Sequence, residues 1–147
     1  MKKLAIISFV IVCIVQGCCT KKDCNSGLYE IVVRDFNESE IDTIILLSYQ
    51  NNGQFTNPID SHVVEGYSNG DGTATLSNYS QLDTNRDYKL LFSGLQKEYK
   101  LTDFQIGRKS CNSCFPFGQE SDFYDVLEGY RLNGELHQGG DGVSISK

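Results

Sequence analysis

The sequence has no apolar stretch long enough to cross a bilayer as a helix. Its amino-terminal run, Leu4–Val15, falls short of the roughly 20 apolar residues that a membrane-spanning helix needs. Basic residues are also few, since 13 Lys and Arg stand against 19 Asp and Glu, for a formal net charge of −6. This balance argues against nucleic acid as a partner, because phosphate binding needs clustered Lys and Arg. It also argues against electrostatic adsorption to anionic lipid.

Tryptophan is absent, only two prolines and two histidines occur, and no stretch sustains a helical pattern. The histidines, His62 and His137, lie in polar, glycine-containing surroundings, and no motif places either beside a nucleophile or a carboxylate. The sequence therefore offers no Ser-His-Asp triad. We predict neither an enzyme nor a protein with a bound cofactor or metal.

The amino terminus has the three parts of a secretory signal, which are a basic start, an apolar run and a small residue at its end. Lys2 and Lys3 are the basic start, Leu4–Val15 is the run, and Gly17 is the small residue. Both lysines would leave with a cleaved leader, so the mature chain would be more acidic still.

The residues Val15-Gln16-Gly17-Cys18 resemble the lipobox of bacterial lipoproteins. In that family the cysteine is lipidated on its sulfur, the chain is cut before it, and the new amino terminus is acylated. The resemblance implies a signal peptide at 1–17 and attachment of acyl chains such as palmitate at Cys18. Two or three acyl chains hold a protein stably on a membrane, whereas one does so only marginally. The alternative interpretation is an ordinary cleaved signal followed by a disulfide cysteine.

The position after Cys18 bears on which membrane the protein would occupy. Lipoproteins with Asp at that position tend to stay in the inner membrane, and here it is Cys19, so the resemblance implies sorting to the outer membrane. Residues 18–27 are expected to form a lipidated tether, which would reach roughly 25–30 Å from Cys18 to Ser26 if fully extended. The sequence thus predicts a lipid-anchored cell-envelope protein.

Cysteine usage agrees with export. Cys13 would leave with the leader and Cys18 would carry lipid, which leaves an even number for disulfides in an oxidising compartment. The disulfide candidates are Cys19, Cys24, Cys111 and Cys114. We favour a bridge from the amino-terminal pair to the carboxy-terminal pair. The CxxC spacing of Cys111 and Cys114 also allows a thiol–disulfide protein, although Phe115-Pro116 is a poor start for the helix that such proteins use.

Alternation of apolar and polar residues predicts several strands. The ranges are 28–36, 41–50, 73–77, 87–93, 98–106 and 143–146. A polar turn is expected at 37–40, and a bulge or turn near Thr102-Asp103, where the apolar phase shifts. Because 41–50 is apolar on both faces, we expect a central strand that is covered on both sides.

Two further stretches are less regular. Residues 51–72 are rich in Asn, Gly, Ser and Asp, which predicts a long surface connection with one edge strand. Residues 123–132 fit either a strand or a helix. Asn133-Gly134 after them is a strong hairpin signal, because both positions of a type I′ turn need positive φ.

Six to eight short strands suggest an all-β fold, a small antiparallel β-sandwich of immunoglobulin-like or transthyretin-like type. We expect it to be a single domain over 28–147. Its predicted role is a non-catalytic binding or structural module with an envelope protein partner. An exposed apolar patch or an open sheet edge would favour this role.

The alternative is an envelope hydrolase acting on glycan or peptide, which would need a cleft with converging carboxylates or histidine. The acidic group Asp35, Glu38, Glu40 and Asp42 is more typical of a solvated turn than of a glycosidase pair. Residues 83–87 begin like a calcium-binding loop, but Tyr88 and Gly94 replace the required Gly and Glu. We interpret this segment, and likewise 69–72, as a turn.

Overall fold

The structure is a computed structural model of the chain. It describes residues 30–77, 82–110, 123–140 and 142–147. Within these ranges no helix is both long enough and apolar enough to cross a membrane.

Contacts between residues divide the chain into two units, and the larger one carries most of the sheet. It comprises Ser26–Gly107 and Asp125–Lys147. The smaller unit comprises Met1–Asn25 and Arg108–Tyr124, of which the structure describes only the ends of two strands. There the Arg108 guanidinium lies 4.6 Å from the centre of the Phe123 ring. The domain bounds inferred from the sequence stay a prediction.

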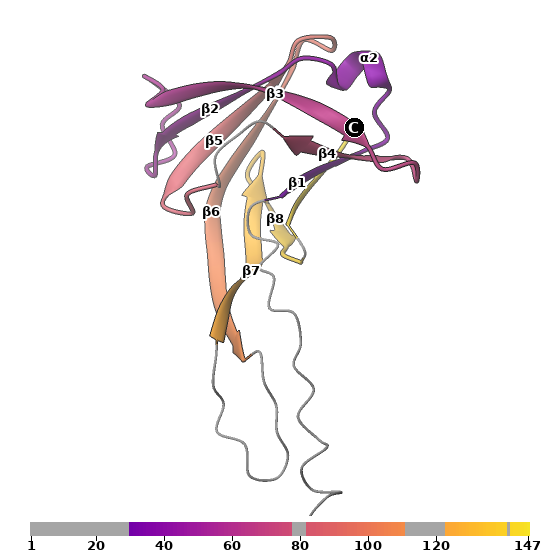
Figure 1. The fold of residues 1–147 in the computed structure, drawn as a ribbon. Coiled ribbons are helices and arrows are strands. Elements are labelled where there is room, and N and C mark those ends of the chain that lie inside the picture. The colour runs from indigo at the N-terminus through magenta and orange to yellow at the C-terminus, as the bar shows by residue number, and fades with distance from the viewer. Residues whose placement is uncertain (1–29, 78–81, 111–122, 141) are drawn as a thin grey trace, which may run out of the picture. The chain divides into compact units, whose positions relative to one another are not determined.

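Nearly all of the regular secondary structure in the described ranges is β-strand, which confirms the predicted class (Figure 1). The described elements are β1 Ile31–Arg34, α2 Glu38–Ile41, β2 Ile44–Gln50, β3 Asp60–Ser68, β4 Thr73–Ser77, β5 Arg86–Phe92, β6 Lys97–Ser110, β7 Phe123–Leu132, β8 Glu135–Gln138 and β9 Val143–Ser146. They form one sheet in the order β8-β7-β6-β5-β2-β3-β4-β1-β9.

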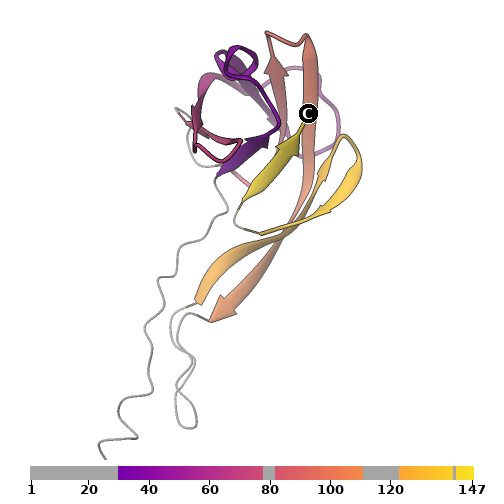
Figure 2. The same cartoon turned by 90° about the vertical axis from the view of Figure 1, so that its right-hand side faces the viewer.

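The sheet curls so that strands far apart in its order face each other across the interior, a sandwich-like arrangement (Figure 2). The Tyr130 hydroxyl of β7 bridges this interior to β9. It accepts a hydrogen bond from the Ser144 N–H and donates one to the Ser144 carbonyl, each 2.8 Å long.

One strand pair departs from the antiparallel pattern expected from the sequence. β9 pairs in parallel with β1, with Ile31 opposite Val143. The antiparallel pairs are β1–β4, β2–β3, β2–β5, β3–β4, β5–β6 and β7–β8. A short turn forces its two strands to be antiparallel, and no such turn joins β1 to β9.

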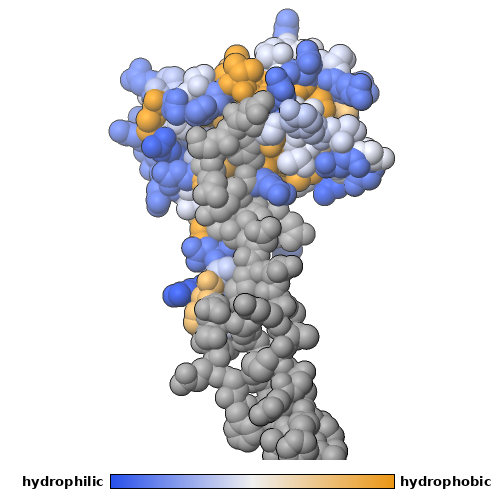
Figure 3. Space-filling view, in the orientation of Figure 1, coloured by the Kyte–Doolittle hydropathy of each residue, from blue (hydrophilic) through white to orange (hydrophobic). Residues whose placement is uncertain are grey.

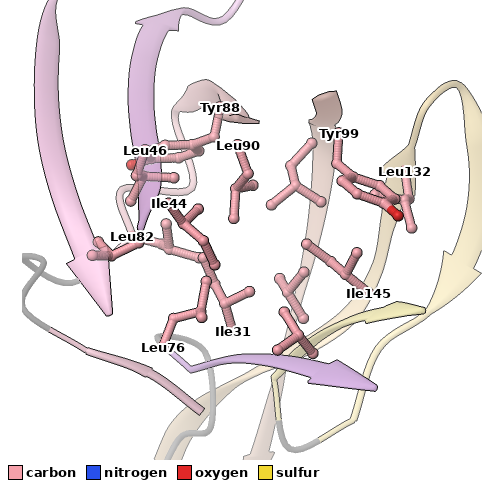
Figure 4. Packing of buried hydrophobic residues seen from close by; sticks show 14 of the residues in the cluster. Ile31, Ile44, Leu46, Leu76, Leu82, Tyr88, Leu90, Tyr99, Leu132 and Ile145 are labelled. Atoms are coloured by element: carbon pink, nitrogen blue, oxygen red, sulfur yellow. The ribbon is translucent and has the colours of Figure 1, made fainter. Parts of the chain in front are cut away.

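The concave face of the sheet holds the apolar core (Figure 4). Figure 4 shows side chains from opposite parts of the sheet pointing into one interior. The most buried members, at most 1 % exposed, are Ile31, Val33, Ile44, Val64, Leu90, Phe92, Leu101, Val143 and Ile145. They occupy alternate strand positions, so the predicted inward face of residues 87–93 (Tyr88, Leu90, Phe92) is confirmed.

The predicted polar turn at 37–40 is instead part of a single helical turn, α2. The Asn37 N–H donates to the Glu40 carboxylate at 2.9 Å, which satisfies a donor at the start of the helix. The sequence predicts that Ile41 begins the following strand. In the structure Ile41 belongs to α2 instead. It packs over Gly66 of β3, where an added Cβ would lie only 2.8 Å from Ile41 Cδ1. The short helix therefore covers one end of the core.

The prediction for residues 51–72 was wrong in its main feature. β3 is a nine-residue strand between β2 and β4, rather than an edge strand in a surface connection. Its polar residues and Gly66 interrupt the alternation of apolar and polar residues by which a strand is recognised in a sequence. The expectation that β2 is covered on both faces was also wrong, because Ile45 and Leu47 on its outer face are only half-buried.

Other local predictions are confirmed. β4 covers the predicted 73–77, and 143–146 form edge strand β9. Residues 123–132, for which the sequence left strand and helix open, form strand β7. Asp103 has a φ of 53°, which marks the irregularity expected at Thr102-Asp103. Asn133 and Gly134, with φ of 52° and 90°, connect β7 to β8 as the hairpin signal requires.

Candidate functional site

An apolar patch lies on the convex, outer face of β3, β2 and β5. In register, Val63 stands opposite Ile45, and Ile45 stands opposite Leu91, so the three side chains form one row across the strands. Leu47 lies two residues along β2 on the same face. Ile59 lies just before β3, and the strand alternation that runs through Ser61 and Val63 places it on this face as well. Val63 is 60 % exposed and Ile59 50 % exposed. We call these five residues the outer patch.

Beside the outer patch, aromatic rings and basic groups pack together. The rings of Tyr49 and Phe55 meet edge to face, with centroids 5.2 Å apart. The ammonium groups of Lys89 and Lys100 lie 5.5 and 5.4 Å from the centre of the Phe55 ring. Glu98 pairs with both lysines at 3.3 Å, so this border is polar and well connected.

Exposed apolar groups also occur elsewhere. On the face seen in Figure 3, hydrophobic side chains reach the surface in separate patches between hydrophilic ones. The outer patch differs from scattered exposure because three of its residues are cross-strand neighbours in one row.

A second feature lies on the concave face, at the end of the core opposite α2. Here the inner positions of β2, β3 and β5 change from apolar to polar. They surround a pocket of about 280 Å³, which we call the polar pocket. Its lining residues are Leu46, Ser48, Asp60, His62, Asp83, Arg86 and Tyr88.

The charged groups of the polar pocket are arranged in two pairs. His62 Nε2 lies 2.9 Å from Asp60 Oδ2, and Arg86 Nε lies 3.3 Å from Asp83 Oδ2. Arg86 Nη1 also donates to Ser48 Oγ at 3.4 Å. Within the described residues, no hydrogen bond joins His62 to the Ser48 hydroxyl. The pocket thus lacks the nucleophile–base contact of a triad.

The pKa values in the pocket do not favour acid catalysis. The Asp60 carboxylate accepts a hydrogen bond from the Ser61 N–H and another from His62, and these hold its pKa below the usual range. A glycosidase acid needs the opposite shift. Burial raises the pKa of Tyr88, whose hydroxyl accepts from the Asp83 N–H at 2.6 Å and donates to the Asp83 carbonyl at 3.2 Å.

The cysteine predictions lie outside the described residues. This applies to the lipid site Cys18, to the CxxC pair, and to the disulfide candidates Cys19, Cys24, Cys111 and Cys114. Lipid attachment, disulfide pairing and thiol chemistry therefore stay predictions.

The other motifs singled out in the sequence have structural roles. Asp83 Oδ1 accepts from the Asn85 N–H at 3.0 Å, which forms the turn before β5. Asp71 accepts from the Thr73 N–H at 3.0 Å in the turn between β3 and β4. No group of three or more His, Cys, Asp or Glu side chains in the described ranges could hold a metal ion.

Within the acidic group around α2, Glu40 forms an ion pair with the last residue of the chain. Glu40 Oε1 lies 2.6 Å from Lys147 Nζ. The hydrogen bond from Lys147 and that from the Asn37 N–H lower the pKa of Glu40. His137, the second histidine, stacks on the Tyr130 ring with centroids 5.6 Å apart.

Sequence reasoning missed the pairing of Asp60 with His62. Residues two apart on a strand lie on the same face, so the pattern Asp60-x-His62-x-Val64 contained the signal. It went unrecognised because this segment was interpreted as a loop. Ser48 and Arg86 come from other strands, and only the register brings them to the same place.

No protein-family model and no curated protein matches the sequence, and no solved structure matches the fold.

Proposed function

We propose that the chain is a lipid-anchored cell-envelope protein whose β-sheet unit binds a partner protein through the outer patch. The observation that carries this proposal is the row of Val63, Ile45 and Leu91, in which Val63 is exposed and Ile45 and Leu91 are half-buried. Aliphatic side chains aligned on three strands offer a contiguous apolar contact, and desolvated apolar contacts dominate the cores of protein interfaces.

The anchor in this proposal comes from the lipobox resemblance at Val15–Cys18 and the signal-like leader. The acidic chain would gain little from anionic lipid or nucleic acid, which leaves protein as the partner class best suited to an apolar patch. Lys89 and Lys100 beside the patch would favour a partner with acidic groups around its own apolar surface.

A binding role is favoured over the hydrolase alternative. The polar pocket does bring histidine and carboxylates together, as a hydrolase would require. However, each carboxylate is paired with a histidine or arginine side chain, and the pKa of Asp60 is lowered, whereas a general acid needs a raised pKa.

Photo-crosslinking in intact envelopes tests the proposal. A photoreactive residue at position 63 is expected to form one discrete crosslinked adduct with another protein. The mass of this adduct should differ from twice that of the mature chain, which excludes a crosslink between two copies of it. Ile45→Asp should reduce this adduct at least about tenfold, because a charge desolvated in the interface weakens binding. The matched control is Leu136 on β8, which is also 60 % exposed. Adducts of equal yield from positions 63 and 136, or none from either, would contradict the proposal.

A further inference from the structure

The polar pocket is a concave site with a defined chemical character. Its volume of about 280 Å³ suits a molecule smaller than a typical drug-sized ligand. The floor is apolar, because it is formed by Leu46, a core residue that is 3 % exposed. The polar groups above it come from three adjacent strands and one turn, so their positions are set by the sheet.

Ser48 stands at the centre of this group. It lies opposite Asp60 of β3 and opposite Tyr88 of β5, and it is 5 % exposed. The Arg86 side chain reaches Ser48 Oγ from the β5 side. Neighbouring strands are about 4.8 Å apart, which places Asp60 beside Ser48 on the β3 side. Arg86 lies opposite Gln50 in the register, and its side chain reaches Ser48 from the other side.

The hydrogen-bonding capacity of Arg86 is only partly used within the described residues. A guanidinium has five N–H donors in a planar fork, and it is suited to bidentate binding of a carboxylate. The contacts with Asp83 and Ser48 involve Nε and Nη1. Further donors on Arg86, together with the Ser48 hydroxyl, can therefore bind an acceptor such as a carboxylate.

The net charge of the pocket argues against a simple anion as its ligand. With histidine counted as neutral, the lining carries two carboxylates and one guanidinium. Asp83 offsets Arg86, so Asp60 contributes an excess negative charge that attracts a cation. A ligand with a cationic group near Asp60 and an anionic group near Arg86 satisfies both sides.

We propose that the polar pocket binds a zwitterionic small molecule of the α-amino acid type. Its ammonium group pairs with Asp60, and its carboxylate accepts hydrogen bonds from Arg86 and Ser48. The side chain of the ligand lies toward Leu46. This inference concerns the concave face and does not depend on the outer patch.

Calorimetric titration of the detergent-extracted full chain tests this inference. Each common α-amino acid is titrated at up to about 10 mM, a range that detects dissociation constants near 1 mM. At least one is expected to bind saturably. Its N-acetyl derivative lacks the ammonium, its amide lacks the carboxylate, and both should bind at least about tenfold more weakly. Failure of every amino acid to bind overturns the inference, as does equal affinity for the N-acetyl derivative, which would indicate an anion site.

Variants then locate the site. Asp60→Asn and Arg86→Gln should each raise the dissociation constant at least about tenfold. The matched control is Arg131→Gln, which breaks a comparable pair, Arg131 with Asp103 at 3.1 Å, outside the pocket. Melting curves confirm that each variant is folded. Unchanged affinity in folded Asp60→Asn and Arg86→Gln would overturn the assignment to this pocket.

Discussion

At the scale of single residues, Asp87 shows how a buried charge organises a loop. It is 1 % exposed and lies on β5, opposite Tyr49. Its Oδ2 accepts hydrogen bonds from the Asn52 N–H at 3.1 Å and the Gly53 N–H at 2.8 Å. Oδ1 is buried and has no hydrogen-bond partner within the described residues. The carboxylate thus holds the loop that brings Phe55 onto Tyr49.

We expect Asp87→Ala to lower the free energy of unfolding by about 2 kcal/mol, because two backbone donors lose a charged acceptor. Asp87→Asn should cost less, since its amide oxygen can still accept from the loop. Urea denaturation measures both changes. Asp125→Ala, at an exposed position of β7, is the control and should lie within about 0.5 kcal/mol of the native chain. An equally small effect of Asp87→Ala would mean that the loop does not depend on this carboxylate.

At the scale of elements, the sequence predicts strands well where one face alternates clearly. β5, with Tyr88, Leu90 and Phe92 inward, and the Asn133-Gly134 turn are such cases. β3 fails because, apart from Val64, its inner positions do not fill the core. Asp60 and His62 line a pocket, and Gly66 makes room for Ile41. These constraints come from contacts with other elements, so local alternation does not reveal them.

Strand β9 provides an element-scale prediction. β1 pairs with it on one side, and Tyr130 and Tyr99 reach it across the interior. Tyr130→Phe removes the hydroxyl that contacts both backbone polar groups of Ser144. We expect a loss of about 1–2 kcal/mol of stability and faster amide hydrogen exchange over Val143–Ser146.

Tyr99→Phe is the matched control for this experiment. Its hydroxyl makes one longer contact, 3.4 Å to the Ser146 carbonyl, so its removal should have a smaller effect. If both variants changed exchange at β9 equally, the two contacts to Ser144 would not be what holds the strand.

At the scale of the whole molecule, the leader and the cysteines govern where the chain acts and what constrains it. We expect the protein extracted from native membranes to begin at Cys18 with added acyl mass. Cys19, Cys24, Cys111 and Cys114 should resist alkylation until reduction. Intact mass measured with and without reduction tests both points. An unmodified start would contradict the anchor, and free Cys111 and Cys114 would instead favour thiol chemistry.

By itself, the sequence determined the all-β class, most strand positions, the irregularity at Asp103 and the Asn133-Gly134 hairpin. These features depend on local alternation and on backbone conformations that few residues adopt. Only the tertiary structure decided that Ile45, Leu91 and Val63 form one row on the outer face, and that Ser48, Asp60 and Arg86 converge at the end of the core. The physical reason is that register and sheet curvature are non-local. A strand's residues do not specify which strand lies beside it, or whether a second layer covers its outer face.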